Sequence, residues 1–408
     1  MPKPKVTILC QLFYPELVST GQTLTELGEE LSSMDVDVEV VCGPPSVVDR
    51  SRPPREMEHN GILIHRTWGT QFPKLSLPGK LSNLVTFALS STCRVLLSRD
   101  ASPLLILTNP PFLAVAGVLC RWIRRRPYIF LVFDVYPDVG RELGVIKPGG
   151  LLERAWDVLN RVLYRNASHV IVLGRCMADV VRRPNKLGPL AEDRLHVIHM
   201  WSDDRTIRAV PRSSSNLLKE WGLEDKFVVQ YSGNMGRIHD IETILQAAWT
   251  LRERRDIHFQ FIGEGYKKRL VQSFLQEKQL GTCSVRTYVP REQLPDSLAA
   301  ASVGIVSLLP ACTGLAVPSK IYGVMAAGRP VIGLMDPGGE AARAVMGSES
   351  GVILQPGDVQ GLVNAIVDLA GNPEKCREMG ERGRRAIDER YSLHAAALQY
   401  REVIASLQ

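Results

Sequence analysis

The chain has 408 residues, which exceeds a single compact core and predicts two or three domains. Hydrophobic residues make up 45% of it and charged residues 23%, as in a soluble globular protein. The net charge of +6 favours an acidic partner such as a nucleotide diphosphate, an anionic lipid surface or a nucleic acid. Nucleic acid ranks last, because no zinc finger, RNA-binding aromatic signature or basic zipper is present.

Targeting and metal-binding signals are missing from the sequence. The start, MPKPKVTILC, leads into a strand pattern instead of the apolar core of a signal peptide, and no stretch is long and apolar enough to span a membrane. We therefore expect a cytoplasmic protein. The eight cysteines form no C-x-x-C pair and no Cys/His cluster, so we expect reduced thiols and no metal site.

The first half of the sequence is typical of an α/β domain. Apolar runs at 5–12 and 36–41 flank a helical pattern of leucines, which predicts a βαβ unit. The unit lacks the G-x-G-x-x-G of a dinucleotide fold, so a dehydrogenase is disfavoured. The loop after the first run carries Glu16 and Gly21, for which a substrate-facing role and a plain connection are equally good interpretations.

Basic residues alternate with apolar ones further along this half. Strands are expected at 62–66, 104–108, 128–133, 169–173 and 195–199, and helices at 80–98, 114–125 and 151–164. The helix at 80–98 and the run RWIRRR at 121–126 suit a surface helix on anionic lipid, where each basic residue contributes about 1 kcal/mol. They suit equally a core-facing stripe with a solvated basic end, so contact with the inner face of the plasma membrane stays open.

Two carboxylates follow the strand expected at 128–133. Asp134 and Asp138, in the sequence DVYPD, should lie at the carboxyl edge of the sheet, where acid/base or orienting groups are needed. Asp138 equally suits a turn cap. We favour a functional role for the pair without choosing between them.

The second half repeats the alternation of strands and helices. A polar, aperiodic segment at 202–215 marks the linker between two similar α/β domains. Strands are expected at 227–231, 257–262, 284–288, 303–308 and from 331 onward, with a last helical pattern at 384–407.

The segment 227–248, FVVQYSGNMGRIHDIETILQAA, looks like a phosphate cradle. It is a buried strand pattern, a bend at Gly233 and Gly236, and a helix with Asp240 as a plausible N-cap. The helix dipole and Arg237 would suit a phosphate. An ordinary strand-to-helix turn would look the same, and the segment alone favours neither interpretation.

A second cation stands in PSKIYGVMAAGRPVI. Lys320 falls in the first turn of an expected helix, after the small-residue loop 311–318. Helix entrances bind anions, but a lone lysine is usually a solvated charge, so the two interpretations again have equal weight.

Taken together, these motifs resemble the GT-B glycosyltransferases of family 4. The matching segments are SGNMGR, VPREQLP, PSKIYGVMAAGRPVI, GGE at 338–340 and GVILQPGD in the second half, and FYPELVSTGQ, TNPP, DVYPD and LYRNA in the first. More narrowly, they resemble bacterial enzymes that extend exopolysaccharide or O-antigen repeat units. The resemblance covers nearly the whole chain. It implies two facing Rossmann-like domains with parallel sheets, at 1–203 and 204–385, and a C-terminal helix at 386–408 that crosses back onto the first domain.

The resemblance also implies a role for each matching residue. The donor diphosphate would be held by Gly233, Asn234, Gly236, Arg237 and Lys320, the donor sugar by Gly314, Leu315, Ala316 and Val317, the ribose by Glu340, and the base by residues near Val289 and Pro290; Asp134 and Asp138 would serve in catalysis, and Glu16 and Gly21 in the acceptor loop.

Three positions depart from the family pattern. Gly323 stands where many members have a ribose-binding glutamate, so Glu340 is the substitute candidate. Phe133 precedes Asp134 where a histidine is common. His239 stands where a second basic phosphate ligand is usual, and would be only partly charged near neutral pH.

The implied reaction is retaining transfer of a sugar from a nucleotide-diphosphate sugar to a hydroxyl of a glycan or lipid-linked acceptor. No metal and no cofactor beyond that co-substrate are expected, because Arg237 and Lys320 would stabilise the departing diphosphate. The diphosphate itself would take the acceptor proton. Two alternatives stay open: a nucleotide-sugar 2-epimerase of the same fold, and a non-catalytic binding subunit of a polysaccharide assembly complex.

Overall fold

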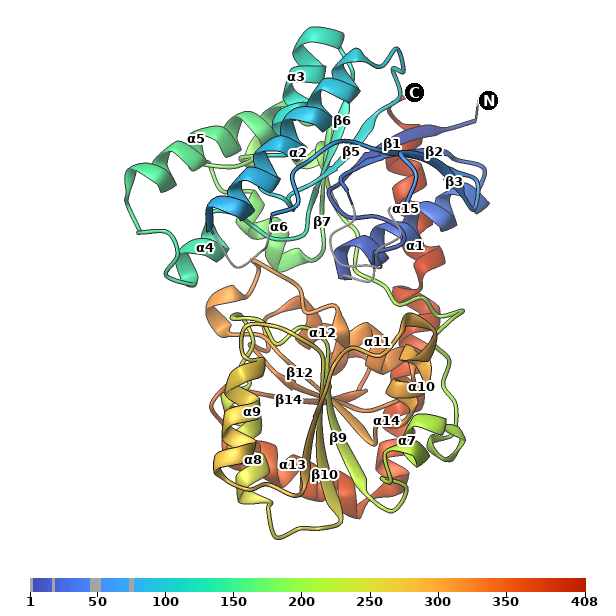
Figure 1. Ribbon diagram of the computed structural model, residues 1–408, viewed down its shortest axis with the longest axis vertical. Coiled ribbons are helices and arrows are strands. Elements are labelled where there is room, and N and C mark those ends of the chain that lie inside the picture. The colour runs from blue at the N-terminus through green and yellow to red at the C-terminus, as the bar shows by residue number, and fades with distance from the viewer. Residues whose placement is uncertain (1–2, 17–18, 45–52, 73–76) are drawn as a thin grey trace. The chain divides into compact units, whose positions relative to one another are not determined.

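A computed structural model describes residues 3–16, 19–44, 53–72 and 77–408 (Figure 1). The chain divides into two compact units, one formed by Met1–His199 with Leu393–Gln408 and the other by Met200–Ser392. Both are α/β units with a central, mainly parallel sheet, as the sequence predicts. Leu17 and Val18, in the loop predicted to face the acceptor, lie outside the described residues.

The sheet of the first unit has the strand order β3-β4-β2-β1-β5-β6-β7-β8. Its strands are β1 (Lys5–Leu9), β2 (Asp37–Cys42), β3 (Glu56–His59), β4 (Ile62–Arg66), β5 (Leu104–Leu107), β6 (Tyr128–Val132), β7 (His169–Val172) and β8 (Leu195–Val197). All neighbours are parallel except β3 and β4. The sequence did not predict β3, because EMEH at the sheet edge carries little apolar signal. The order reverses between β1 and β5, and ligands of open α/β sheets bind at such a switch point.

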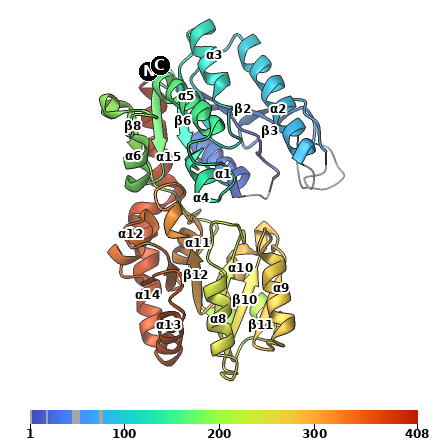
Figure 2. The ribbon, with the colours of Figure 1, turned by 90° about the vertical axis from the view of Figure 1, so that its left-hand side faces the viewer.

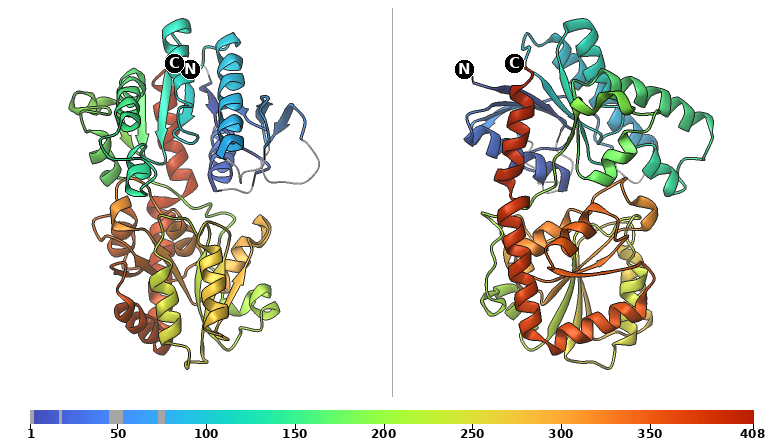
Figure 3. Two further views of the ribbon diagram at one scale, coloured as in Figure 1. Left: turned by 60° about the vertical axis from the view of Figure 1, so that its left-hand side comes forward. Right: turned by 180° about the vertical axis from the view of Figure 1, so that it is seen from behind.

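Helices cover both faces of this sheet. They are α1 (Ser19–Ser33), α2 (Leu77–Leu97), α3 (Val115–Arg124), α4 (Asp138–Glu142), α5 (Leu151–Asn166), α6 (Arg175–Val181) and α15 (Leu393–Ala405). On one face α3 packs between α2 and α5 (Figure 1). On the other, α15 packs against α1 and β1 (Figure 3, right). Because both faces are covered, β5 and β6 are buried throughout and consist of uninterrupted apolar residues.

The second unit has a six-stranded sheet in which every pair is parallel, with the order β11-β10-β9-β12-β13-β14 (Figure 2). Its strands are β9 (Phe227–Ser232), β10 (Ile257–Ile262), β11 (Cys283–Arg286), β12 (Val303–Ser307), β13 (Val331–Leu334) and β14 (Gly351–Leu354). Its helices are α7 (Asn216–Glu220), α8 (Glu242–Thr250), α9 (Lys268–Glu277), α10 (Leu294–Ala299), α11 (Lys320–Ala326), α12 (Glu340–Gly347), α13 (Val359–Gly371) and α14 (Pro373–Ala386). The order reverses between β9 and β12, so the loop after β9 begins at the switch point.

The last helical pattern of the sequence is interrupted in the structure. After α14, a π-helical turn spans Ile387–Tyr391, and α15 begins at Leu393. Among the described residues, no helix is both long and apolar enough to cross a membrane.

Arg126 does not belong to the solvated arginine run that the sequence predicts. Its side chain is 2% exposed, and its Nε donates to the Ser102 carbonyl at 2.6 Å. Its Nη2 donates to the Thr7 hydroxyl at 2.6 Å and lies 3.4 Å from Asp100 Oδ2. Arg126 therefore joins strand β1 to the segment before β5, which corrects its assignment to the surface.

We expect Arg126→Ala to lower the free energy of unfolding by about 3 kcal/mol, because it leaves Asp100 without its buried partner. Arg121→Ala removes an exposed arginine from the same run and should cost less than about 0.5 kcal/mol. Urea denaturation of both variants measures the difference, and equal losses would contradict the structural role of Arg126.

Candidate functional site

Lys320 joins two loops at the carboxyl edge of the second sheet. From the start of α11, its Nζ donates to the Asn234 carbonyl at 2.7 Å and to the Tyr231 hydroxyl at 2.6 Å. It also lies 4.3 Å from the centre of the Tyr231 ring. An ammonium group has three donors, so one remains for a ligand. The structure thus brings Lys320 and the bend after β9 together, as the motif order implies.

Glycines make this close approach possible. Gly233 has a φ of 128°, and a Cβ there would lie 2.5 Å from Lys320 Cε. A Cβ on Gly263 would lie 2.1 Å from the Gly233 carbonyl oxygen, and one on Gly265 would lie 2.5 Å from Asn234 Oδ1. Three glycines from two neighbouring strand ends therefore pack backbone against backbone. Gly236 is different: its φ is not positive and a Cβ would meet nothing closer than 3.1 Å, so the bend does not require a glycine there.

Sequence reasoning missed the second of these loops, GEGY after β10. The signal was present, because a Gly-x-Gly at the end of the strand beside β9 must reach the same sheet edge.

Burial changes the charges around the bend. It lowers the pKa of the Lys320 ammonium to about 7, so this side chain is only partly charged at neutral pH. His239 is buried and its Nδ1 donates to the Ser307 carbonyl at 2.6 Å. Burial, with the nearby Lys320 charge, lowers the pKa of His239 to about 3. His239 is therefore neutral near physiological pH, which argues against its expected role as a second basic phosphate ligand.

The amino end of α8 is already occupied. Asp240 caps it as predicted, since Oδ1 accepts from the Thr243 amide at 3.1 Å. Oδ2 of the same side chain accepts from the Gly357 amide at 3.1 Å, and the Glu242 carboxylate accepts from the Ile241 amide. The carboxylates of Asp240 and Glu242 thus lie at the positive end of the α8 dipole. These carboxylates argue against the expectation that this helix end points at a phosphate, which leaves the bend and Lys320 as the candidate anion-binding groups.

Arg237 is exposed beside the bend. Its guanidinium carbon lies 4.0 Å from the centre of the Tyr266 ring, so the ring contacts the guanidinium face. Among the residues described, none accepts a hydrogen bond from this side chain or from the amides of Gly236 and Arg237. Tyr288 lies next to the bend, with a ring carbon 3.3 Å from where a Gly263 Cβ would stand. The tyrosine side chains at 266 and 288 are 67% and 52% exposed, and neither was predicted from the sequence.

The loop after β12 lies against the same bend, because the Leu309 amide donates to the Ile238 carbonyl at 2.8 Å. Within it Gly314 has a φ of 75°, and Leu315 and Ala316 are buried, which leaves Val317 as the more exposed of the three neighbours. Glu340 is buried as the first residue of α12. Gly339, just before it, faces Thr313 of this loop, so the residues predicted for the donor sugar and the ribose come from adjoining segments.

The two aspartates of the first unit have different environments. The Asp134 amide donates to the Thr108 hydroxyl at 3.2 Å, and burial raises the pKa of its carboxyl group to about 6. Asp138 is buried and pairs with the fully buried Lys186 at 2.7 Å, and with Arg183 and Arg141 at 3.6 and 3.7 Å. These ion pairs give Asp138 a structural role, which corrects its assignment as an acid/base group.

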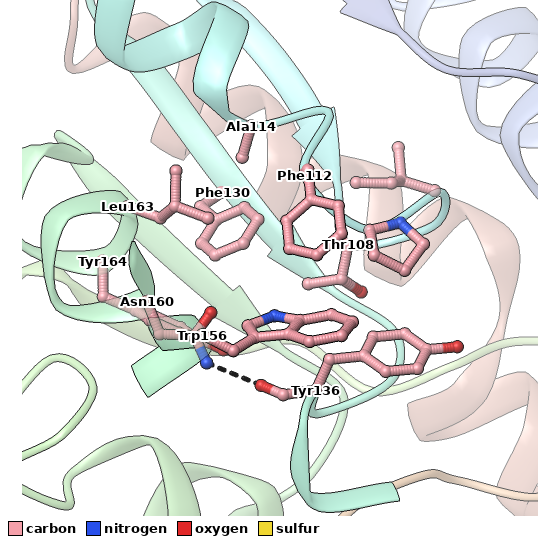
Figure 4. A pocket seen from close by; sticks show the side chains of 11 residues that line it. Thr108, Phe112, Ala114, Phe130, Tyr136, Trp156, Asn160, Leu163 and Tyr164 are labelled. Atoms are coloured by element: carbon pink, nitrogen blue, oxygen red, sulfur yellow. Dashed lines mark hydrogen bonds between the residues drawn. The ribbon is translucent and has the colours of Figure 1, made fainter. Parts of the chain in front are cut away.

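An aromatic pocket opens beside Asp134 at the end of β5 and β6. Figure 4 shows its wall, formed by Leu107, Thr108, Pro111, Phe112, Ala114, Phe130, Tyr136, Trp156, Asn160, Leu163 and Tyr164. The Phe112 and Trp156 rings lie 4.4 Å apart, and Asn160 Nδ2 donates to the Tyr136 carbonyl at 2.6 Å. Burial and the neighbouring Asp134 raise the pKa of the Tyr136 hydroxyl. The sequence could not reveal this pocket, because Trp156 resembles any core residue of a helix until the fold sets it beside Phe112.

Glu16, in the loop after β1, is a buried residue. Glu16 is 4% exposed, and a Cβ on Gly21, in the first turn of α1, would lie 3.0 Å from Glu16 Cβ. Glu16 and Gly21 are therefore brought together, but the carboxylate is buried instead of exposed to an acceptor. In the part of the chain that the structure describes, no three His, Cys, Asp or Glu side chains are grouped as metal ligands.

Two parts of the sequence match family models of glycosyltransferase domains. The model for a glycosyl transferase 4-like domain matches residues 20–201, and that for glycosyl transferases group 1 matches residues 226–372. The chain belongs to the GT-B glycosyltransferases of the family 4 type.

Individual relatives agree with this family. A probable glycosyltransferase, WbjE of Pseudomonas aeruginosa, is 30% identical over 264 residues, 64% of each protein. This match thus spans less than two thirds of that relative. The putative colanic acid biosynthesis glycosyl transferase WcaI of Escherichia coli is 24% identical over 78% of this chain and 79% of its own.

Solved structures share the fold over the whole chain. Sucrose-phosphate synthase from Thermosynechococcus elongatus superimposes with a TM-score of 0.77 at 17% identity, over 99% of this chain and 100% of its own. HepE of Anabaena, solved with UDP-glucose, has a TM-score of 0.73 at 14% identity, with the same coverage of both chains. The predicted GT-B fold is therefore confirmed.

We expect nucleotide binding to take up a proton. An anion beside Lys320 restores its pKa toward the ordinary lysine value, so the lysine, mostly neutral at about pH 8, should gain close to one proton per nucleotide bound, and little at about pH 6. Calorimetry with UDP, GDP or ADP in buffers of different ionisation enthalpy measures the uptake. Lys320→Met should abolish it, and uptake that survives this change would show that another group titrates.

Proposed function

We propose that the chain is a retaining glycosyltransferase that moves a sugar from a nucleotide-diphosphate sugar to a hydroxyl group of a glycan or lipid-linked acceptor, without a metal. The observation that carries the proposal is Lys320, a partly buried ammonium group fixed over Gly233 by a tyrosine hydroxyl and a backbone carbonyl. Such a fixed cation, with the exposed guanidinium of Arg237 nearby, suits the charge of a departing diphosphate.

The donor would lie along the carboxyl edge of the second sheet. Its diphosphate would accept from Lys320, Arg237 and the amides of the bend. Tyr288 stands beside the bend with half of its ring exposed, which suits stacking on the base close to Val289 and Pro290. Val317 and the backbone of its loop would face the transferred sugar, and Glu340 the ribose. The UDP-glucose in the structure of HepE supports this class of donor.

The acceptor hydroxyl would be oriented by Asp134, and the neighbouring aromatic pocket would cover an apolar face of the acceptor. In the transfer, the acceptor oxygen forms a bond to the anomeric carbon while the bond from that carbon to the diphosphate oxygen breaks. The acceptor proton passes to the diphosphate on the same face of the sugar, so the configuration is retained. Lys320 and Arg237 balance the charge of the leaving group throughout.

Turnover tests the donor residues. A thermal-shift panel of UDP-, GDP- and ADP-sugars first identifies the donor; release of its nucleoside diphosphate with lipid-linked or saccharide acceptors then measures transfer. We expect Lys320→Ala and Arg237→Ala each to lower turnover about a hundredfold, because each removes a fixed donor to the leaving group. Lys278→Ala, a cation of the same unit at the end of α9, is the control and should leave turnover unchanged.

The alternatives predict other products. A 2-epimerase would release UDP and epimerised sugar from UDP-GlcNAc without any acceptor, and a binding subunit would show no turnover at all. Full turnover in both the Lys320 and Arg237 variants would reject the assignment of the diphosphate site.

The pH profile tests Asp134. Because burial raises its pKa to about 6, the carboxylate form that orients the acceptor is present above that pH and is lost below it. We expect kcat/KM to fall on the acid side of about pH 6, and Asp134→Asn to lose both this acid limb and about a hundredfold in rate. Asp138→Asn should lower the melting temperature instead and keep the acid limb. An acid limb that persists in Asp134→Asn would assign the titration to another group.

A further inference from the structure

An apolar stripe faces outward along α2. Leu81, Val85 and Leu89 follow one another at four-residue spacing and are 58%, 45% and 63% exposed, and Leu97, nearer the end of the helix, is 81% exposed. Residues four apart lie on one face of a helix. Phe87 and other residues of the opposite face are buried, so only that side of α2 packs into the core. The interpretation of the leucine pattern as a purely core-facing stripe is therefore wrong.

Helix α3, which packs beside α2, and helix α5, which packs on the other side of α3, also carry exposed apolar side chains. Trp122 and Ile123, near the end of α3, are 62% and 64% exposed. Leu151 and Leu152, at the start of α5, are 85% and 60% exposed, and Val158 of that helix is 55% exposed. We call the exposed side chains of α2, α3 and α5 the three-helix face. These are the helices seen together in Figure 1 on one side of the first sheet. So many exposed apolar side chains on three neighbouring helices are unusual on a water-facing surface and suit an interaction site.

The charges on the three-helix face are predominantly positive. Its exposed basic residues, with those directly following its helices, are Lys80, Arg99, Arg121, Arg124, Arg125, Arg154, Arg161 and Arg165, whereas Arg94 is paired with Glu56 of β3 at 3.5 Å. Residues 77–99 and 115–126 contain no aspartate or glutamate. In α5, Glu153 is buried against Arg141, and Asp157 accepts from Asn185. The apolar side chains are thus surrounded by an excess of positive charge.

We propose that the three-helix face docks on a bilayer that contains anionic lipids, with its apolar side chains at the boundary of headgroups and acyl chains and its arginines among the phosphates. Helices that lie in a membrane interface combine these two features. A second copy of the chain is the other candidate occupant. A symmetric interface would place this positive face against itself, and the like charges would repel. The docking does not depend on the proposed reaction, although it would bring the enzyme to a lipid-linked acceptor.

Vesicle sedimentation tests the docking. The probes are vesicles of phosphatidylcholine with about one third phosphatidylglycerol, and vesicles of phosphatidylcholine alone. We expect the full chain to sediment with the anionic vesicles, and less so as salt is added, because salt screens the attraction. The double variant Leu81→Asp, Leu89→Asp should weaken the partition about tenfold or more. Each of Lys80→Gln and Arg121→Gln should weaken it about fivefold.

Leu398→Asp is the matched control. It places the same charge on an exposed leucine of α15, on the other side of the sheet, and should leave the partition unchanged. Circular dichroism melting verifies that each variant is folded. As a readout that needs no destabilising change, brominated acyl chains should quench the fluorescence of the parent chain, and Trp122→Phe should reduce that quenching.

Three results would overturn the proposal. Equal sedimentation of the double variant and the parent would exclude the three-helix face as the docking surface. Equal sedimentation with neutral and anionic vesicles would exclude the role of its arginines. A dimer in light scattering that the double variant disperses, without vesicle binding by the parent, would assign the face to a second copy.

Discussion

The contact of Lys320 with the bend after β9 is the constraint on which the proposed donor site depends. An ammonium group is held against a carbonyl and a tyrosine hydroxyl, at a distance that only Gly233 permits. The glycines of the next loop then allow that loop to close on the bend. Such burial is costly for an unpaired cation, and the low pKa of Lys320 expresses this cost. A site with this property gains most when an anion arrives, because the anion returns the lysine to its charged form.

Burial also acts on two carboxylates of the first unit, with a different result for each. Asp138 is buried with Lys186 and two arginines, so its charge is neutralised within the protein and fixes α4. Asp134, four residues before it, has no cation partner among the described residues, and burial raises its pKa to about 6, the range in which an acid/base group titrates. The Thr108 hydroxyl fixes the backbone at Asp134 beside the aromatic pocket. The partners of each carboxylate, and not its position in DVYPD, therefore distinguish the ion-paired Asp138 from Asp134, the candidate functional residue.

The arginines of the run at 121–126 are likewise divided between the core and the surface. Arg126 lies in the core and ties β1 to the segment before β5, whereas Arg121, Arg124 and Arg125 remain exposed beside Trp122. Together with the outward stripe of α2, these exposed residues form a positive apolar face. The sequence suits both a cytoplasmic protein and a membrane-associated one. The two differ in whether water or lipid covers the three-helix face.

The sequence by itself determined the alternation of buried strands and helices, the two α/β units, and the strand ends at which Lys320, Arg237 and Asp134 lie. Apolar periodicity and glycine positions are local signals, and parallel strands bring their carboxyl ends to one edge, so these features follow from the order of residues. Only the tertiary structure decided that His239 is neutral, that Asp138 and Arg126 are structural, that Trp156 lines a pocket with Phe112, and that the leucines of α2 face outward. Each of these depends on burial and on partners far away in the chain, and a side chain's charge and exposure follow from its neighbours in space.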